Sequence, residues 1–333
     1  MRLKTLAYLI LIIIVLSQPT ATFQYAYQGL YQWAVKMVPT LFPFMMISSV
    51  MIYSGADIEL GHLLSHLLKR VYHYSEYGLY AIFIGFLCGF PMGAKVVSEL
   101  YENGKISQAE AQSLLGFCNN IGPAYFLGII LPILGECGYH NKLPFLFGMY
   151  GIPAVYGILL SRRYTKHSSF TEITPNSKNI QNTYSNNKNN KNTNSNNPHY
   201  NKPIPLPSII KKACLENTQS LILLGGYITF TNSFRILLDF IPIAANGKSV
   251  LSSFIEIIGG VQSIYITTLS SAEKVFWTMT ALCFSGISCL LQTSSFLEKS
   301  NLSLFQYLKN KVFITGVSAI YYIVILVLMN PFH

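Results

Sequence analysis

Residues 89–123, GFPMGAKVVSELYENGKISQAEAQSLLGFCNNIGP, place glycines, prolines and charged side chains inside a very apolar chain. The GFPMG segment at 89–93 ends a helix that begins near Tyr77, because proline and paired glycines remove helical hydrogen bonds and favour a reversal. A turn at 103–104 follows, and NNIGP at 119–123 interrupts the next helix. The stretch therefore predicts a helical hairpin followed by a helix with an unwound centre.

The composition identifies a polytopic membrane protein. Hydrophobic residues make up 51% of the chain and charged residues only 11%. The chain is therefore more apolar than an ordinary soluble protein. We expect the first apolar run to be a retained span rather than a cleaved signal peptide, because no clear small-residue cleavage site follows Ser17. The six cysteines form no CxxC pair and indicate packing residues rather than disulfides or a metal site. Runs long enough to cross a bilayer, about 20 residues, lie at 3–18 with its flank, 29–53, 143–161, 213–242 and 312–329.

A basic, asparagine-rich stretch divides the chain in two. Its centre, residues 176–203, cannot bury enough apolar surface to offset the cost of ordering, so residues 162–207 are predicted to form a disordered linker. Its positive charge places it in the cytoplasm, and we favour this orienting role over nucleic-acid binding. The basic residues in or beside it, against the single acid Glu172, are Arg162, Arg163, Lys166, Lys178, Lys188, Lys191, Lys202, Lys211 and Lys212.

The two halves repeat one order of elements. In the first half, hairpin 77–104 precedes broken helix 107–135; in the second, hairpin 250–270 meets Gly259 and Gly260 and precedes broken helix 273–300, which is interrupted at 285–288. Each broken helix starts with an S-x-x-E capping box. These boxes are Ser107 with Glu110 and Ser270 with Glu273.

Counting the spans between the two copies predicts that the first hairpin enters the membrane from the cytoplasmic side and the second from the opposite side. The repeats are therefore predicted to be inverted. Residues 1–161 form the first membrane half, with two N-terminal helices, an interfacial helix, the hairpin, the broken helix and helix 143–161. Residues 208–333 form the second, with helix 213–242, the hairpin, the broken helix and helix 312–329. This all-α topology places the N-terminus and the linker in the cytoplasm and the C-terminus opposite. On the cytoplasmic side it also places Lys69, Arg70, Lys105, Lys309 and Lys311.

Inverted repeats with hairpins and broken helices are typical of secondary transporters, whose irregular backbone lines a cavity near the midplane. Half-helix N-termini there attract anionic groups. The alternative is that the breaks are kinks for close helix packing. The candidate substrate-binding residues are Gly89, Pro91, Gly93, Lys95, Asn119, Asn120, Gly122, Pro123, Glu256, Gly259, Gly260, Ser288 and Gln292.

Several of these residues have an alternative interpretation. Lys95 could bind a carboxylate or pair with Glu99 one turn later. The Asn119 and Asn120 side chains could bind substrate or satisfy the unwound backbone. Glu256 could carry a proton or cation, or make a structural hydrogen bond. Phe90 or Tyr125 could stack on an aromatic substrate.

The sequence gives no indication of an enzyme. It contains no HExxH, no phosphate-binding glycine loop with lysine and serine or threonine, and no GxSxG motif. We therefore expect no cofactor and no nucleic-acid partner. The expected partners are a lipid bilayer and a small anion, and both a monomer and a homo-oligomer are compatible with the sequence. A non-transporting membrane scaffold is the alternative class.

The string GFPMGAKVVSELYENGKISQAEAQSLLGFCNNIGPAYFLG at 89–128 resembles the YlbJ (SpoVV) family of sporulation integral membrane proteins, in the nucleoside-recognition or Gate domain group. Glu256 with Gly259 and Gly260, and residues 284–308, resemble its second half, although Ser285 and Gly286 stand where a glycine pair is expected. The asparagine-rich linker is not part of the family pattern.

This resemblance implies a multi-pass protein related to concentrative nucleoside transporters. It would move dipicolinic acid across the outer forespore membrane during sporulation. A nucleoside-type or other ion-coupled carrier and a sporulation scaffold are the alternatives. The planar, doubly charged dipicolinate anion would suit helix N-termini plus a cation, and Lys95 is the expected cation.

Overall fold

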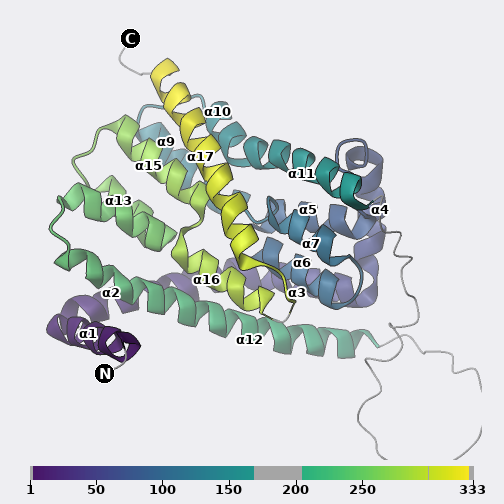
Figure 1. Cartoon of the computed structure of the whole chain (residues 1–333), viewed down its shortest axis with the longest axis horizontal. Coiled ribbons are helices and arrows are strands. Elements are labelled where there is room, and N and C mark those ends of the chain that lie inside the picture. Colours follow the sequence, from purple (N-terminus) through teal and green to yellow (C-terminus); the bar gives the residue numbers. More distant parts are fainter. Residues whose placement is uncertain (1–2, 169–204, 299, 330–333) are drawn as a thin grey trace, which may run out of the picture.

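The computed structural model describes residues 3–168, 205–298 and 300–329, and this part of the chain is helical without a β-strand. Five of its helices are long and apolar enough to cross a membrane: Pro19–Ser54, Leu143–Tyr164, Leu206–Phe240, Ser271–Leu297 and Leu304–Leu328. The predicted class, an all-α polytopic membrane protein, is confirmed (Figure 1).

The N-terminal region is one short helix followed by one long helix. The long helix starts at Pro19, ten residues before the expected span at 29–53, because proline is tolerated at the first helical position, where no N–H is needed. Gly55, at φ +84°, ends it. The elements are α1 (Leu3–Ser17), then α2 (Pro19–Gln32), the π-helical turn η1 (Trp33–Met37) and α3 (Val38–Ser54) in one continuous rod, and α4 (Ala56–Leu68).

The rest of the first half follows the predicted order closely. The hairpin is α5 with α6, and the broken helix is α7 followed, after an irregular stretch at 116–122, by α8 to α9. The elements are α5 (Glu76–Cys88), α6 (Met92–Glu102), α7 (Gln108–Leu115), α8 (Pro123–Tyr125), η2 (Phe126–Ile130), α9 (Leu131–Glu136), α10 (Leu143–Leu146), η3 (Phe147–Gly151) and α11 (Ile152–Ser168).

The second half contains the other hairpin and broken helix. Its hairpin starts at Ala245 rather than at 250, and the break falls at Glu256 instead of Gly259 and Gly260, which lie inside the second helix. The break at Ser285 is as expected. The elements are α12 (Leu206–Ser233), η4 (Phe234–Phe240), α13 (Ala245–Ile255), α14 (Ile257–Tyr265), α15 (Ser271–Phe284), α16 (Gly286–Leu297) and α17 (Leu304–Leu328).

The ends of the predicted linker are helical where the structure describes them. Helix α11 continues past residue 161 to Ser168, and α12 begins at Leu206, seven residues before the predicted start at 213, and ends at Ser233, where η4 follows. Residues 169–204, which hold most of the predicted disordered segment, lie outside the described residues.

The two predicted capping boxes differ. Ser270 and Glu273 form the complete reciprocal box at the start of α15. Ser107 caps α7 through the Glu110 N–H, but the Glu110 carboxylate does not return to it. Instead Glu110 accepts from the backbone N–H and the hydroxyl of Ser75, at 2.8 and 2.7 Å, and so ties α7 to the start of α5. The predicted return bond from the Glu110 carboxylate to the Ser107 backbone was therefore wrong, because Glu110 binds Ser75 of a distant segment instead.

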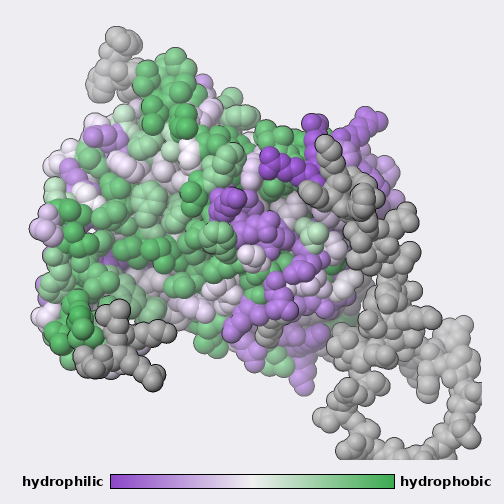
Figure 2. All heavy atoms as spheres, viewed as in Figure 1, coloured by the Kyte–Doolittle hydropathy of each residue, from purple (hydrophilic) through white to green (hydrophobic). Residues whose placement is uncertain are grey.

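Apolar and polar side chains separate on the surface. Figure 2 shows apolar residues over α13, α15 and the upper part of α17, and hydrophilic residues around the start of α17 and the far end of α11. Helix α17 exposes Phe313, Ile320, Val324 and Val327, among other large apolar side chains. Lipid provides the apolar surroundings that such a surface needs, as expected for a membrane-spanning protein.

Candidate functional site

The four helix breaks of the structure meet at one cavity of about 540 Å³. The first hairpin contributes Cys88 and Phe90, and the first broken helix contributes residues 121–125. The second hairpin contributes residues 256–258, and the second broken helix contributes Ser285, Ser288, Cys289 and Gln292. Side chains of η1 and α3, together with Ile129 of η2 and Ile228 of α12, complete the wall. Segments far apart in the sequence thus converge on one central space, which we call the four-break cavity.

The tip of the first hairpin packs backbone to backbone against the first broken helix. A Cβ on Gly89 would lie 2.2 Å from the Gly122 nitrogen, and one on Gly85 would lie 2.2 Å from the Cys118 carbonyl oxygen. Gly89 also has φ +83°, a conformation that favours glycine. The Phe90 N–H donates to the Asn120 carbonyl. Close packing therefore accounts for Gly89, and the same holds for Gly93, whose Cβ would lie 2.5 Å from the Cys118 carbonyl oxygen.

The tip of the second hairpin is closed by a carboxylate. Glu256 is buried, and its two oxygens accept from the N–H groups of Ile258 and Gly259 at 2.9 and 2.7 Å. Glu256 therefore caps α14 and uses the donors that an anion would need there. Gly260 allows the hairpin to close on itself, since its Cβ would lie 2.2 Å from the Ser253 Cα atom.

Two other helix N-termini open onto the cavity without a side-chain cap. The helical segment from Pro123 to Glu136 begins after Gly122, and α16 begins after Ser285; neither has a side-chain cap hydrogen bond. The first turns of both segments line the cavity. Free N–H groups and the positive end of the helix dipole make such termini suitable for negatively charged groups.

Lys36 is the basic residue of the cavity lining, and Glu256 is the acidic one, among the residues that the structure describes. Lys36 lies in the π-helical turn η1, a distortion often found at functional sites. Lys36 was not among the predicted site residues. The available signal was that Lys36 is the single charged residue in the apolar segment 19–54, where an ionisable residue indicates function.

Lys95, the expected cation, does not line the cavity. Its buried ammonium pairs with Glu99 and donates to the Ser49 hydroxyl at 3.0 Å. This geometry favours the structural interpretation of Lys95 given above.

Asn119 and Asn120 also lie outside the cavity lining and support the unwound backbone. The Asn119 amide donates to Thr293 and Tyr307 of the second half, at 3.2 and 2.9 Å. The Asn120 amide donates to the Phe117 carbonyl at 2.6 Å. The Asn119 bonds connect the break in the first half to α16 and α17, whereas the Asn120 bond stays within the unwound segment.

Lys311 corrects the predicted charge distribution. It is buried rather than at the cytoplasmic surface, and its ammonium donates to the Asn119 carbonyl at 2.7 Å. It therefore satisfies one of the carbonyls that the unwound segment leaves without a helical partner. As a buried cation, Lys311 is not one of the surface charges on which the predicted orientation depends.

The structure thus divides the predicted site residues. The four-break cavity is lined by Gly122, Pro123, Glu256, Ser288 and Gln292. Gly259 lines a neighbouring pocket. The remaining predicted residues, Gly89, Pro91, Gly93, Lys95, Asn119, Asn120 and Gly260, are absent from the linings of these two described cavities.

These features define a polytopic helical membrane protein with a central cavity formed at its helix breaks. The chain is 24% identical, over 322 aligned residues, to the sporulation integral membrane protein YlbJ of Bacillus subtilis (strain 168). The similarity covers 89% of this chain and 75% of that protein, and it makes the chain a distant relative of YlbJ. No protein-family model matches the chain, and no solved structure matches it.

Proposed function

We propose that this protein is a membrane carrier of a small organic anion. The observation that carries the proposal is the convergence of four helix breaks on one cavity of about 540 Å³, within the range of small-molecule sites. Breaks of this kind are tolerated in a membrane where they line a cavity, and carriers place their substrate there.

The charge of the substrate follows from the groups that face the cavity. Two uncapped helix N-termini and Lys36 offer positive potential, while the carboxylate of Glu256 is already engaged by two N–H groups. An anion gains from both helix termini without many full charges in the membrane interior. Lys36 takes the role of cation that the sequence analysis gave to Lys95.

The substrate we propose is dipicolinate, carried across the outer forespore membrane during sporulation. The relationship to a protein named for sporulation supports this setting. Phe90 and Tyr125 in the cavity lining provide aromatic faces for a planar ring, and Ser288 and Gln292 provide polar groups. We further propose that the carrier is related to concentrative nucleoside transporters. Its N-terminus lies in the cytoplasm and its C-terminus on the opposite side of the membrane.

The test is uptake of radiolabelled dipicolinate into liposomes that contain the purified protein, with nucleosides and other dicarboxylates as competitors. We expect saturable uptake that nucleosides do not inhibit. Lys36→Met should lower uptake about 10- to 100-fold, as expected for the loss of a charge-assisted hydrogen bond. Lys36→Arg, which keeps the charge, is the matched control.

Three outcomes would contradict this proposal. Inhibition by nucleosides with no uptake of dipicolinate would favour a nucleoside-type carrier. No flux of either compound, with normally folded protein, would favour the scaffold. Unchanged uptake by Lys36→Met would remove Lys36 from the substrate site.

A further inference from the structure

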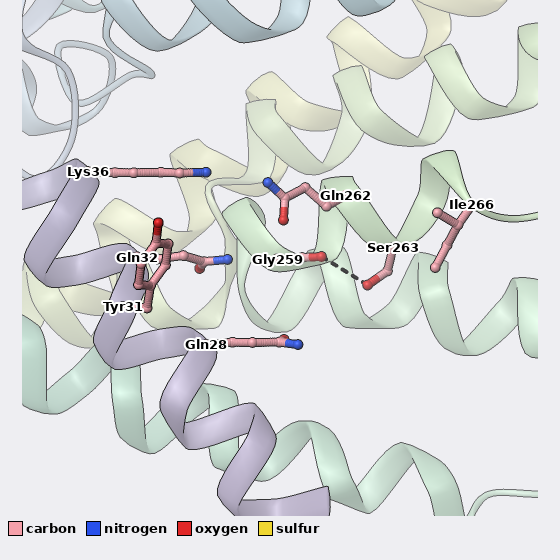
Figure 3. Close-up of a pocket in the computed structure, with 8 residues that line it drawn as sticks. All are labelled: Gln28, Tyr31, Gln32, Lys36, Gly259, Gln262, Ser263 and Ile266. Carbon is pink, nitrogen blue, oxygen red and sulfur yellow. Dashed lines mark hydrogen bonds between the residues drawn. The ribbon is translucent and has the colours of Figure 1, made fainter.

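A second pocket of about 410 Å³ lies beside the four-break cavity, between the α2–η1 rod and α14. Figure 3 shows Gln28, Gln32 and Lys36 extending from the rod toward α14, which carries Gly259, Gln262 and Ser263. Ile266, at the end of α14, is 87% exposed and marks the outer rim. We call this space the α2–α14 pocket.

The two cavities share one residue, Lys36, which lines both. The other side chains that line the α2–α14 pocket carry no formal charge, and three of them are glutamine amides. The described lining of the pocket therefore combines one cation with several hydrogen-bond donors and no acidic side chain. This chemistry suits a carboxylate.

A buried guanidinium and a buried carboxylate lie together behind one wall of the pocket. Arg235 of η4 is buried and donates to Ser263 at 2.9 Å and to Gln28 at 3.5 Å, both of which line the pocket. A Cβ on Gly259 would lie 2.7 Å from Arg235 Nη1, so the guanidinium lies directly behind that part of the wall. Glu256 accepts from the Gly259 N–H and offsets Arg235 in part, which leaves Lys36 as the cation of the lining.

Gln32 contributes a hydrogen-bond donor to the pocket wall. Its side chain is 5% exposed, and its Oε1 atom is buried without a hydrogen-bond partner among the described residues. The Oε1 atom therefore faces away from the open space of the pocket. The Gln32 NH2 group points toward α14 (Figure 3), and its Nε2 atom lies 3.4 Å from where a Gly259 Cβ would be, so Gln32 can donate to an anion in the pocket.

We propose that the α2–α14 pocket is a second carboxylate site, and that Lys36 contacts the bound anion from either cavity. Its role as a station on the substrate path rests on the proposed function. A dicarboxylate can bind by one carboxylate among the glutamines and then by the other in the four-break cavity, with Lys36 as the common partner. Anion binding in the pocket itself does not depend on transport.

The experiment measures the charge selectivity of thiol labelling in a cysteine-free variant that carries Gln262→Cys. Anionic sulfonate and cationic trimethylammonium methanethiosulfonate reagents are compared, with and without dipicolinate. Ala244→Cys, on the exposed turn before α13, is the matched control. We expect the anionic reagent to react about fivefold faster than the cationic one at Gln262→Cys, relative to the same ratio at Ala244→Cys.

Two further variants isolate Lys36 and the second cavity. Lys36→Met should bring the reagent ratio close to that of the control and remove protection by dipicolinate, whereas Lys36→Arg should retain both. Ser288→Trp, which fills the four-break cavity, should leave protection at Gln262→Cys in place.

The outcomes separate this proposal from the proposed function. Equal labelling by the two reagents, or protection that disappears in Ser288→Trp, would overturn the second site even if dipicolinate is transported. Charge-selective labelling with protection by dipicolinate would support the second site even if liposomes show no flux.

Discussion

The two halves of the molecule contain the same order of elements but hold their hairpins differently. The first hairpin is attached to its broken helix by glycines, with Gly89 directly against Gly122. The second hairpin closes on itself at Gly260 and Ser253, and its tip is capped by Glu256. Figure 1 shows α5, α6 and α7 of the first half on one side of the molecule and α13, α15 and α16 of the second half on the other.

This difference indicates a division of roles. Backbone contact without intervening side chains leaves no room for the first hairpin to shift on its broken helix. The second hairpin carries its own internal contact and presents an ionisable group to the cavity. We therefore expect the first half to be the rigid part of the site and the second to respond to the substrate.

The largest expected effect concerns the direction of the two hairpins in the membrane. Asn103 lies at the open end of the first hairpin, and Thr268 lies just after the second hairpin, so Asn103→Cys and Thr268→Cys report on the two ends. In a cysteine-free background, an impermeant thiol reagent should label them from opposite sides, because inverted repeats enter the membrane from opposite faces. Labelling of both from one side would make the repeats parallel.

The next effect tests the glycine contact of the first half. Gly89→Ala places a residue with a Cβ at φ +83°. This Cβ would lie 2.2 Å from the Gly122 nitrogen, a backbone atom that cannot move aside as a flexible side chain could. We expect a loss of about 2–5 kcal/mol, seen as a lower midpoint of thermal aggregation in detergent. Gly128→Ala, where a Cβ meets nothing within 4 Å, is the control. A stable Gly89→Ala variant would refute the rigid contact.

The buried ion pair of the first hairpin gives a smaller effect. Lys95→Met leaves the Glu99 carboxylate without its cation and should destabilise the protein by about 3 kcal/mol. The double variant Lys95→Met with Glu99→Gln should recover most of the stability and the flux. A double variant that is stable but inactive would instead place Lys95 in substrate binding.

The smallest effect is expected from the asparagine-rich linker. Deletion of residues 176–201 should leave insertion and transport nearly unchanged, because loop length alters the free energy of folding by less than about 1 kcal/mol. Membrane yield and liposome uptake measure this. A deletion variant that inserts normally but does not transport would reveal a regulatory element in the linker.

The order of helices and the position of their breaks follow closely from the sequence. Proline and glycine segments such as GFPMG and NNIGP act through their own backbone, so their effect does not depend on distant partners. The Ser270 and Glu273 box is equally local and formed as predicted. The second hairpin was predicted to break at Gly259 and Gly260, but the structure breaks it at Glu256. The two glycines instead lie inside α14, where they allow close packing of their neighbours.

Local sequence signals could not predict which side chains face the cavity. Lys95 and Lys36 are both lysines in apolar helices, and only their packing partners distinguish them: Glu99 and Ser49 surround one, while the other faces two cavities. Likewise Glu110 leaves its local cap for Ser75, and Lys311 binds the Asn119 carbonyl. Local backbone chemistry determines where a helix starts and breaks, whereas the environment of a long side chain depends on which segments pack against it in three dimensions.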